Sequence, residues 1–218
     1  MSSREDILGR VRARLGRTAD NAVAGHARVE AVLDARPKGP KPTVDSGREG
    51  LVARFRAKSE ASSSSVERVG SRDEVPAVVA RYLAAMGLGM RAVIQPAVAD
   101  LDWRGAGLHV EARGAVDADL VGITGCFCAI AETGTLMLCS APGTPAAVSL
   151  LPETHIALVD AIRIVAHMED AWNLARAELG GLPRAVNFIS GPSRTGDIEL
   201  TIVLGAHGPY RVHLVIHD

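Results

Sequence analysis

From Val66 to the end of the sequence, short apolar segments rich in β-branched residues alternate with amphipathic segments of helical period. The apolar segments, such as 91–98 and 155–159, are nearly continuous in apolar residues instead of alternating with polar ones. Strands of that kind are buried on both faces, which is typical of a parallel sheet covered by helices. The alternation therefore predicts a three-layer α/β fold, with a mostly parallel central sheet and helices on both faces.

Local signals place the other elements of this α/β region. Further strands are predicted at 66–69, 108–112, 120–124, 128–132, 136–139 and 186–189, and further helices at 146–151 and 169–179. A helix at 71–87 has Ser71 as its N-cap and Gly87 as its stop. Segments 198–204 and 210–216, joined by GAHGP, are predicted to form a terminal hairpin.

The first quarter of the sequence, residues 1–65, has a different character. An amphipathic helix is predicted up to Gly16, followed by a connector at 35–47 that is dense in proline and glycine. A short helical pattern at 51–57 precedes four consecutive serines. We therefore expect a helical N-terminal extension and linker over 1–65 and an α/β domain over 66–218.

Composition excludes several classes of protein. The net charge of -1 and a pI near 6.7 give no electrostatic attraction to nucleic acid or to an anionic membrane. The sequence shows neither a secretion signal nor an apolar run approaching the roughly 18 residues of a membrane span, so a cytoplasmic protein is expected. No lysine follows Lys58, so the α/β region can supply neither a P-loop lysine nor a Schiff-base lysine.

The three cysteines are odd in number and lie in apolar segments, which argues against a disulfide framework. The spacing of Cys126, Cys128 and Cys139 matches neither zinc pairs nor an iron–sulfur run. Buried structural thiols are favoured over a metal site. The sequence predicts no metal site and gives no evidence of a cofactor.

The polar stretch AETGT, residues 131–135, interrupts the apolar segments where a strand of such a sheet would end. Glu132 follows the apolar CAIA, so its carboxylate is expected to be poorly solvated. Gly134 allows the backbone to approach another group closely, and Thr133 and Thr135 supply hydroxyls. These residues can hold a small substrate against a carboxylate; the alternative is a tight turn closed by the threonines' own hydrogen bonds.

A second polar stretch is SGPSRTGDIE, residues 190–199. Its small and hydroxyl-bearing residues can form an anion-binding loop, namely Ser190, Gly191, Ser193, Thr195 and Gly196. Arg194 is the nearby cation. Asp197 and Glu199 face the same side on a strand, but the alternative is a helix N-cap followed by a solvated glutamate. His207 in GAHGP either projects into a pocket or is a plain turn histidine.

Ordered motifs extend from residue 123 to residue 209. They are ITGxxxAIAETGT (123–135), SxPG with LLPxxHI (140–156), ISGPSxTxDIE (189–199) and GxHGP (205–209). Together they resemble the lactate-utilisation protein C family, the LUD domain. The sequence departs from the family's usual pattern at 126–128, where the family has a more polar or aromatic segment.

The resemblance implies a fold similar to the sugar-phosphate isomerase and CoA-transferase superfamily. It also implies a role in oxidising L-lactate to pyruvate, together with iron–sulfur oxidoreductase subunits as partners. Better-known enzymes of the superfamily use a carboxylate near a glycine-rich turn, and Glu132 is the residue that corresponds to it.

The two polar stretches are together expected to form one pocket for a small carboxylate or phosphorylated ligand. In this hypothesis Ser190, Ser193 and Thr195 are donors, Asp197 is an orienting acceptor and Glu132 is the acid/base. Two alternatives stay open: a non-catalytic accessory or assembly subunit that docks through its N-terminal segment, and an unassigned CoA-transferase-like or cyclo-ligase-like enzyme. The sequence also leaves open whether the chain is an enzyme and whether it forms a homo-oligomer.

Overall fold

The computed structural model describes residues 3–37, 39–45, 47–198 and 201–218, and the side chains at 19, 20, 196–198, 201 and 202 lie outside that description. The chain divides into two compact units, Met1–Lys41 and Pro42–Asp218. The first contains helices α1 (Ser3–Arg14) and α2 (Ala19–Ala35). No helix in the described part of the chain is both long enough and apolar enough to cross a membrane.

Helix α2 was not predicted, although its start carries a clear local signal. The Thr18 hydroxyl accepts a hydrogen bond from the Asn21 backbone N–H at 3.3 Å, and the Asn21 side chain accepts one from the Thr18 N–H at 3.0 Å. This reciprocal capping box satisfies two backbone donors that the first helical turn leaves free.

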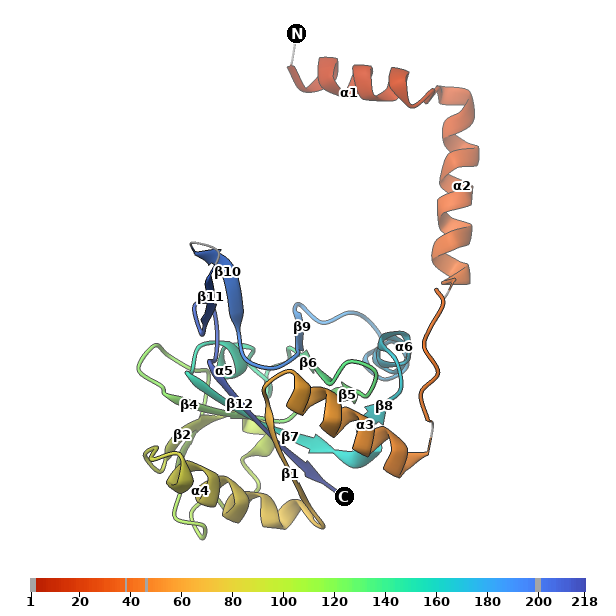
Figure 1. Ribbon diagram of the computed structural model, residues 1–218. Coiled ribbons are helices and arrows are strands. Elements are labelled where there is room, and N and C mark those ends of the chain that lie inside the picture. The colour runs from red at the N-terminus through yellow and green to blue at the C-terminus, as the bar shows by residue number, and fades with distance from the viewer. Residues whose placement is uncertain (1–2, 38, 46, 199–200) are drawn as a thin grey trace. The chain divides into compact units, whose positions relative to one another are not determined.

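The second unit is built around a six-stranded sheet in which all neighbouring strands are parallel (Figure 1). Its order is β1 (Ser65–Val69), β12 (Arg211–His217), β7 (Thr154–Asp160), β4 (Val121–Thr124), β2 (Arg91–Ile94) and β3 (His109–Ala112). The prediction of an α/β fold with a mostly parallel central sheet is confirmed.

A second, four-stranded sheet has the order β8 (Ile164–Val165), β5 (Cys128–Ile130), β6 (Thr135–Cys139) and β9 (Val186–Ile189). Strands β5 and β6 are antiparallel. Only 131–134 connect them, and a connection that short cannot make the crossover that parallel pairing needs. The AETGT stretch is therefore the turn of a hairpin and the first residue of β6.

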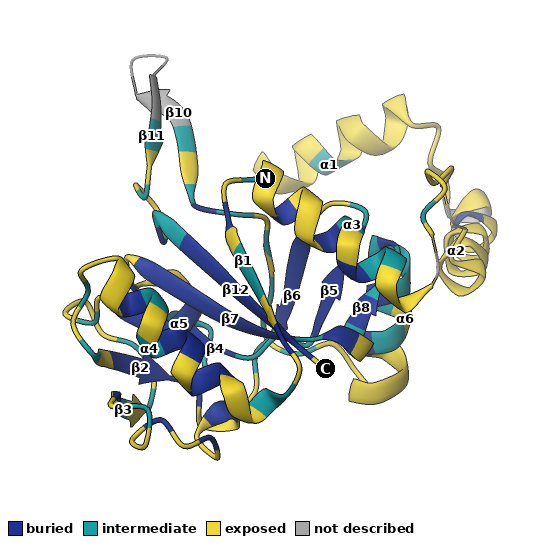
Figure 2. Cartoon of the chain, turned by 60° about the horizontal axis from the view of Figure 1, so that its bottom comes forward, coloured by how far each residue is buried: buried dark blue, intermediate teal, exposed yellow. Residues whose placement is uncertain are grey.

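In the second unit, strands such as β4, β7 and β12 are buried, while helices α3 (Arg48–Ala61) and α4 (Val75–Ala85) each carry one buried and one exposed face (Figure 2). Helix α4 packs on one face of the six-stranded sheet, against side chains that include Ile156 and Leu158. The opposite face, which carries Ala157 and Val159, meets helix α3 and the second sheet. Helix α6 (Met168–Leu179) covers the far side of that second sheet, and the short α5 (Ala147–Leu150) lies against β4 and β7.

Helix α3 was assigned to the N-terminal extension from its sequence. In the structure it belongs to the α/β unit, because Val52 and Phe55 are 4% and 0% exposed and lie in the core shared with β7 and β12. Of the four serines at 62–65, the first three form the turn that follows α3 and Ser65 is the first residue of β1. They connect two packed elements over a very short distance.

The predicted terminal hairpin is wrong. Strand β11 (Thr201–Leu204) pairs with β10 (Arg194–Ile198) in an antiparallel ribbon, while β12 runs parallel between β1 and β7. The reason is burial: residues 212–217 are all buried, and the centre of a covered parallel sheet can accept such a strand. The local pattern of two apolar runs around a glycine-containing turn does not distinguish these arrangements.

Two histidines lie within the parallel sheet. His155 is fully buried, and its Nε2 is 2.8 Å from the Thr124 hydroxyl. His213 is 3% exposed, with Nδ1 2.8 Å from the Ser65 hydroxyl and its ring stacked on Tyr82 at 3.9 Å between centroids. Burial lowers the pKa of each imidazole from 6.5 to about 4. Both rings are therefore neutral at pH 7.

These histidines predict a pH-dependent stability. Between pH 6.5 and 4 the unfolded chain binds protons at His155 and His213 that the folded chain does not, so the free energy of unfolding falls as pH falls through that window. We expect a loss of about 1 kcal/mol per histidine between pH 7 and 5.5. Urea unfolding at pH 7.5, 6.5 and 5.5 measures this loss. His207 is exposed, so His207→Gln is a control that should leave the pH dependence of the free energy of unfolding unchanged. A pH-independent midpoint would contradict the assignment.

Candidate functional site

The two polar stretches singled out from the sequence meet at the C-terminal end of helix α3. The Ser59 hydroxyl donates to the Gly134 carbonyl at 3.3 Å, and the Arg194 guanidinium donates to the Ser62 carbonyl at 3.4 Å. A Cβ on Gly134 would lie 2.5 Å from the Ser59 nitrogen, and one on Gly191 would lie 2.1 Å from the Ser62 oxygen. The close approach that these glycines permit is therefore to the backbone of α3.

Three hydroxyls form a chain that joins the two stretches. The Thr133 and Thr135 hydroxyls are 2.7 Å apart, and the Thr135 and Ser190 hydroxyls are also 2.7 Å apart. Thr135 is buried, whereas Thr133 and Ser190 are exposed. Each hydroxyl has one proton, so two hydrogen bonds use two of the three protons. When both bonds run in the same direction along the chain, the hydroxyl at one exposed end, Thr133 or Ser190, keeps a donor that can bind an anion.

Glu132 lies beside this hydroxyl chain and pairs with a histidine. Its Oε2 is 2.8 Å from Nδ1 of His167, with the side chains 25% and 11% exposed respectively. A neutral imidazole with its proton on Nδ1 donates to the carboxylate and leaves Nε2 as an acceptor. The arrangement can orient and stabilise a carboxylate that exchanges protons with a ligand.

His167 was missed as a site residue from the sequence. It lies 35 residues from Glu132 along the chain and directly precedes α6, so no motif spacing joins the two. The only local signal is the helix start HMED, in which the Asp170 carboxylate accepts from the His167 backbone N–H at 3.2 Å. The pairing of β5 with β8 is what carries His167 to the end of β5.

Other predicted site residues lie in a neighbouring group. The Ser193 N–H donates to the Pro209 carbonyl at 2.8 Å, and the Gly205 N–H donates to the Ser193 carbonyl at 2.9 Å. GAHGP therefore lies beside Ser193, with His207 exposed. Thr195 is half-buried in β10. The side chain of Asp197 lies outside the described part of the structure, so the expected role of its carboxylate stays a prediction.

Of the three cysteines, Cys128 is buried, as expected, whereas Cys126 and Cys139 are half-buried. Burial raises the pKa of the Cys128 thiol to about 12 and also raises the pKa values of Cys126 and Cys139. The Cys128 sulfur is 3.8 Å from that of Met137 in the core between the second sheet and α6. Among the residues that the structure describes, no three histidine, cysteine or acidic side chains gather as a metal site would require.

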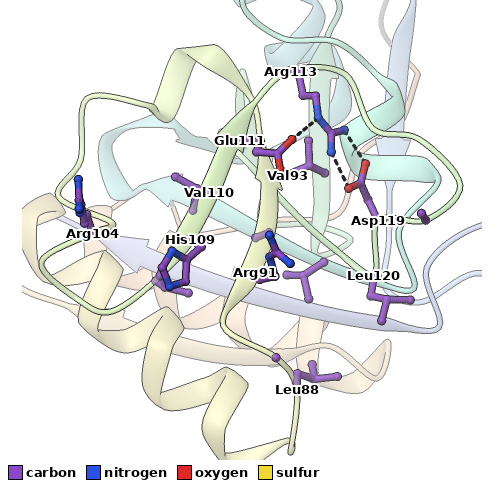
Figure 3. A pocket seen from close by; sticks show the side chains of 15 residues that line it. Leu88, Arg91, Val93, Arg104, His109, Val110, Glu111, Arg113, Asp119 and Leu120 are labelled. Carbon is purple, nitrogen blue, oxygen red and sulfur yellow. Dashed lines mark hydrogen bonds and ion pairs between the residues drawn. The ribbon is translucent and has the colours of Figure 1, made fainter.

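Two cavities lie away from these predicted residues, and neither is lined by them. One, of about 850 Å³, opens at the carboxyl ends of the six-stranded sheet. The other, of about 650 Å³, lies beside edge strand β3 (Figure 3). There Arg113 donates to both Glu111 and Asp119 at 2.8 and 2.7 Å, and this hydrogen bonding lowers the pKa of the Asp119 carboxyl. The paired Arg113 is therefore largely neutralised in that cavity.

Comparison with curated proteins finds relatives over part of the chain. A protein named "Lactate utilization protein C" from Exiguobacterium is 43% identical over 108 residues, which are 48% of this chain and 46% of the relative. A protein of the same name from Macrococcus caseolyticus is 35% identical over 127 residues, 55% of each chain. The chain thus matches about half the length of these curated relatives.

A solved structure matches more of the chain. The crystal structure of a DUF162 family protein from Deinococcus radiodurans superposes with a TM-score of 0.62 at 26% identity, over 79% of this chain and 99% of that one. The family model for the LUD domain matches residues 52–217. Its first residue lies within α3, in agreement with the packing of that helix in the α/β unit. Because the match takes in all strands of the parallel sheet, this chain belongs to the LUD domain family.

Proposed function

We propose that this protein is a component of an L-lactate utilisation system and that it binds a small carboxylate beside Glu132. Support for the pathway comes from the relatives named "Lactate utilization protein C". In that role the chain acts in the oxidation of L-lactate to pyruvate with iron–sulfur partner subunits, which receive the electrons.

The observation that carries the proposed site is the Glu132–His167 pair at 2.8 Å, where Glu132 directly precedes Thr133 of a hydroxyl chain whose two ends are exposed. The carboxylate of lactate accepts from that donor, and the Arg194 guanidinium lies along the same helix end. Glu132 then takes the proton of the substrate's hydroxyl, with His167 orienting the carboxylate through its Nδ1 proton. The C2–H bond breaks in the same oxidation, its two electrons pass to the iron–sulfur partner subunits, and its proton leaves to solvent.

Replacing Glu132 by Gln tests this role. The amide keeps the size of the side chain but cannot act as a base, so we expect lactate oxidation by the protein with its partner subunits to fall about a hundredfold or more. Thermal shift in the presence of L-lactate and pyruvate is measured in parallel, since a bound ligand at one hundred times its dissociation constant stabilises by about 2.7 kcal/mol.

The matched control is Glu153→Gln, which removes an exposed carboxylate outside the site and should retain full activity. His167→Asn should lower activity less than Glu132→Gln, because it removes the orienting group and leaves the base. Full activity of Glu132→Gln in an intact complex would exclude the catalytic role.

A second candidate function is that of an accessory subunit that docks on iron–sulfur partner proteins through residues 1–35. It is favoured by the exposure of three apolar side chains at helical spacing, namely Ile7 and Val11 on α1 and Leu15 directly after it, at 53%, 47% and 67%. Deleting residues 1–35 should then abolish co-purification of the partner subunits while the α/β unit unfolds at an unchanged temperature. Retained co-purification would exclude docking by this segment.

A further inference from the structure

The cavity at the carboxyl ends of the parallel sheet is built by residues that directly end or follow four adjacent strands. Gln95 follows β2, Gly125 follows β4, Asp160 ends β7 and His217 ends β12. In open α/β sheets this edge is where ligands bind, because backbone and side-chain polar groups converge there. The cavity volume of about 850 Å³ suits a cofactor-sized molecule and far exceeds what a three-carbon acid fills.

Two buried polar side chains in the cavity lack hydrogen-bond partners. Gln95 is 2% exposed; its Oε1 has no partner among the described residues, and its Nε2 reaches the Pro145 carbonyl only at 3.5 Å. His217 is 7% exposed, and its Nδ1 is likewise unpartnered within the described residues. An unsatisfied buried polar group costs about 1–3 kcal/mol. A ligand that supplies both a donor and an acceptor would remove that cost.

The rest of the lining combines an apolar wall with balanced charges. The wall includes Val98, Phe127, Leu138, Leu158, Leu179 and Leu182. Leu179 and Leu182 are 41% and 70% exposed, so a bound ring would cover apolar surface that now faces solvent. Among the charged lining residues, Arg72 and Arg163 are balanced by Asp160 and Glu178. The part of a ligand that packs on the apolar wall therefore meets no net charge from these lining residues.

The two arginines retain hydrogen-bonding capacity. Arg72 uses two of its five N–H groups on Asp100, and Arg163 uses three, one on the Phe127 carbonyl and two on Glu178. The remaining N–H groups can bind the anionic part of a ligand without disturbing these pairs.

We propose that this cavity binds the heteroaromatic ring of a nucleoside-type cofactor. The Gln95 amide pairs with a donor–acceptor edge of the ring, as Gln does with adenine, and His217 supplies a further contact. The leucines and Phe127 pack on the ring faces, and Arg72 and Arg163 take the phosphate. The site is distinct from the Glu132 group and does not depend on lactate as the substrate.

Binding of AMP, FMN and NADH to the full chain, by equilibrium dialysis and thermal shift, tests the proposal. At least one should bind at a single site. Gln95→Met should weaken the binding of that probe about tenfold. It should not lower the melting temperature, because the substitution removes an unsatisfied acceptor. If Gln95 serves only folding, Gln95→Met should instead lower the melting temperature of the protein.

A second variant tests the same cavity without replacing Gln95, in case Gln95→Met does not fold. Ala141 is exposed and lines the cavity, so Ala141→Trp fills it from the solvent side and should abolish binding. Ala118→Trp, an exposed substitution in the other cavity, is the matched control and should bind normally. Glu132→Gln should also bind normally, which separates this site from the lactate proposal. The idea is overturned if none of the three probes binds, if binding survives Ala141→Trp, or if inorganic phosphate alone competes fully.

Discussion

Replacing Phe55 by Ala is expected to lower the free energy of unfolding by about 3–5 kcal/mol. The side chain is 0% exposed and fills the core between α3 and strands β7 and β12, so truncation removes buried apolar surface and leaves a cavity. Urea unfolding followed by tryptophan fluorescence measures the loss, since Trp103 is buried in the same α/β unit.

Two controls locate that effect. Phe55→Leu keeps most of the volume and should cost less than about 1.5 kcal/mol. Leu33→Ala, on α2 and 65% exposed, should change stability by no more than about 0.5 kcal/mol. A loss below 1 kcal/mol for Phe55→Ala, on the order of a surface substitution, would mean that α3 is an appendage after all.

Replacing Gly134 by Ala is expected to lower the free energy of unfolding by about 2–4 kcal/mol, through backbone strain and through contact of the added Cβ with α3. Gly134 has φ +69, which L side chains rarely adopt, and its Cβ would lie 2.5 and 2.6 Å from backbone atoms of Ser59 and Lys58. Because those atoms belong to a packed helix, α3 or the turn must shift. We therefore expect the Glu132–His167 site to lose its geometry, which the lactate and pyruvate thermal shifts would report.

Gly180→Ala separates the two sources. Gly180 has a similar φ of +64 at the end of α6, but nothing lies within 4 Å of an added Cβ. Gly180→Ala should lower the free energy of unfolding by the backbone strain alone, about 1–2 kcal/mol. Equal losses in the two variants would show that contact with α3 contributes nothing.

The candidate site was only partly visible in the sequence. AETGT and SGPSRTGDIE were identified because glycines and hydroxyls interrupt apolar strands, and the structure does bring Thr135 and Ser190 to 2.7 Å. The sequence did not show why Gly134 and Gly191 are glycines. Both pack closely against the backbone at the end of α3, which lies over seventy residues before Gly134 in the chain. His167 carried no spacing signal, and Gln95 lay inside the predicted strand 91–98, whereas β2 ends at Ile94.

What the sequence by itself determined is whatever depends on short-range periodicity: the α/β class, the strands of the parallel sheet, and helix α4, which begins at Val75 after a 3-10 turn that Ser71 caps. The tertiary structure alone decided strand order and register, and with them the interior place of β12 between β1 and β7, the separate sheet of β5 and β6, and the packing of α3. Strand pairing and core packing join residues far apart in the chain, so no short window of the sequence contains a pattern that predicts them. The Glu132–His167 pair and the cavity at Gln95 and His217 exist only because those long-range contacts form.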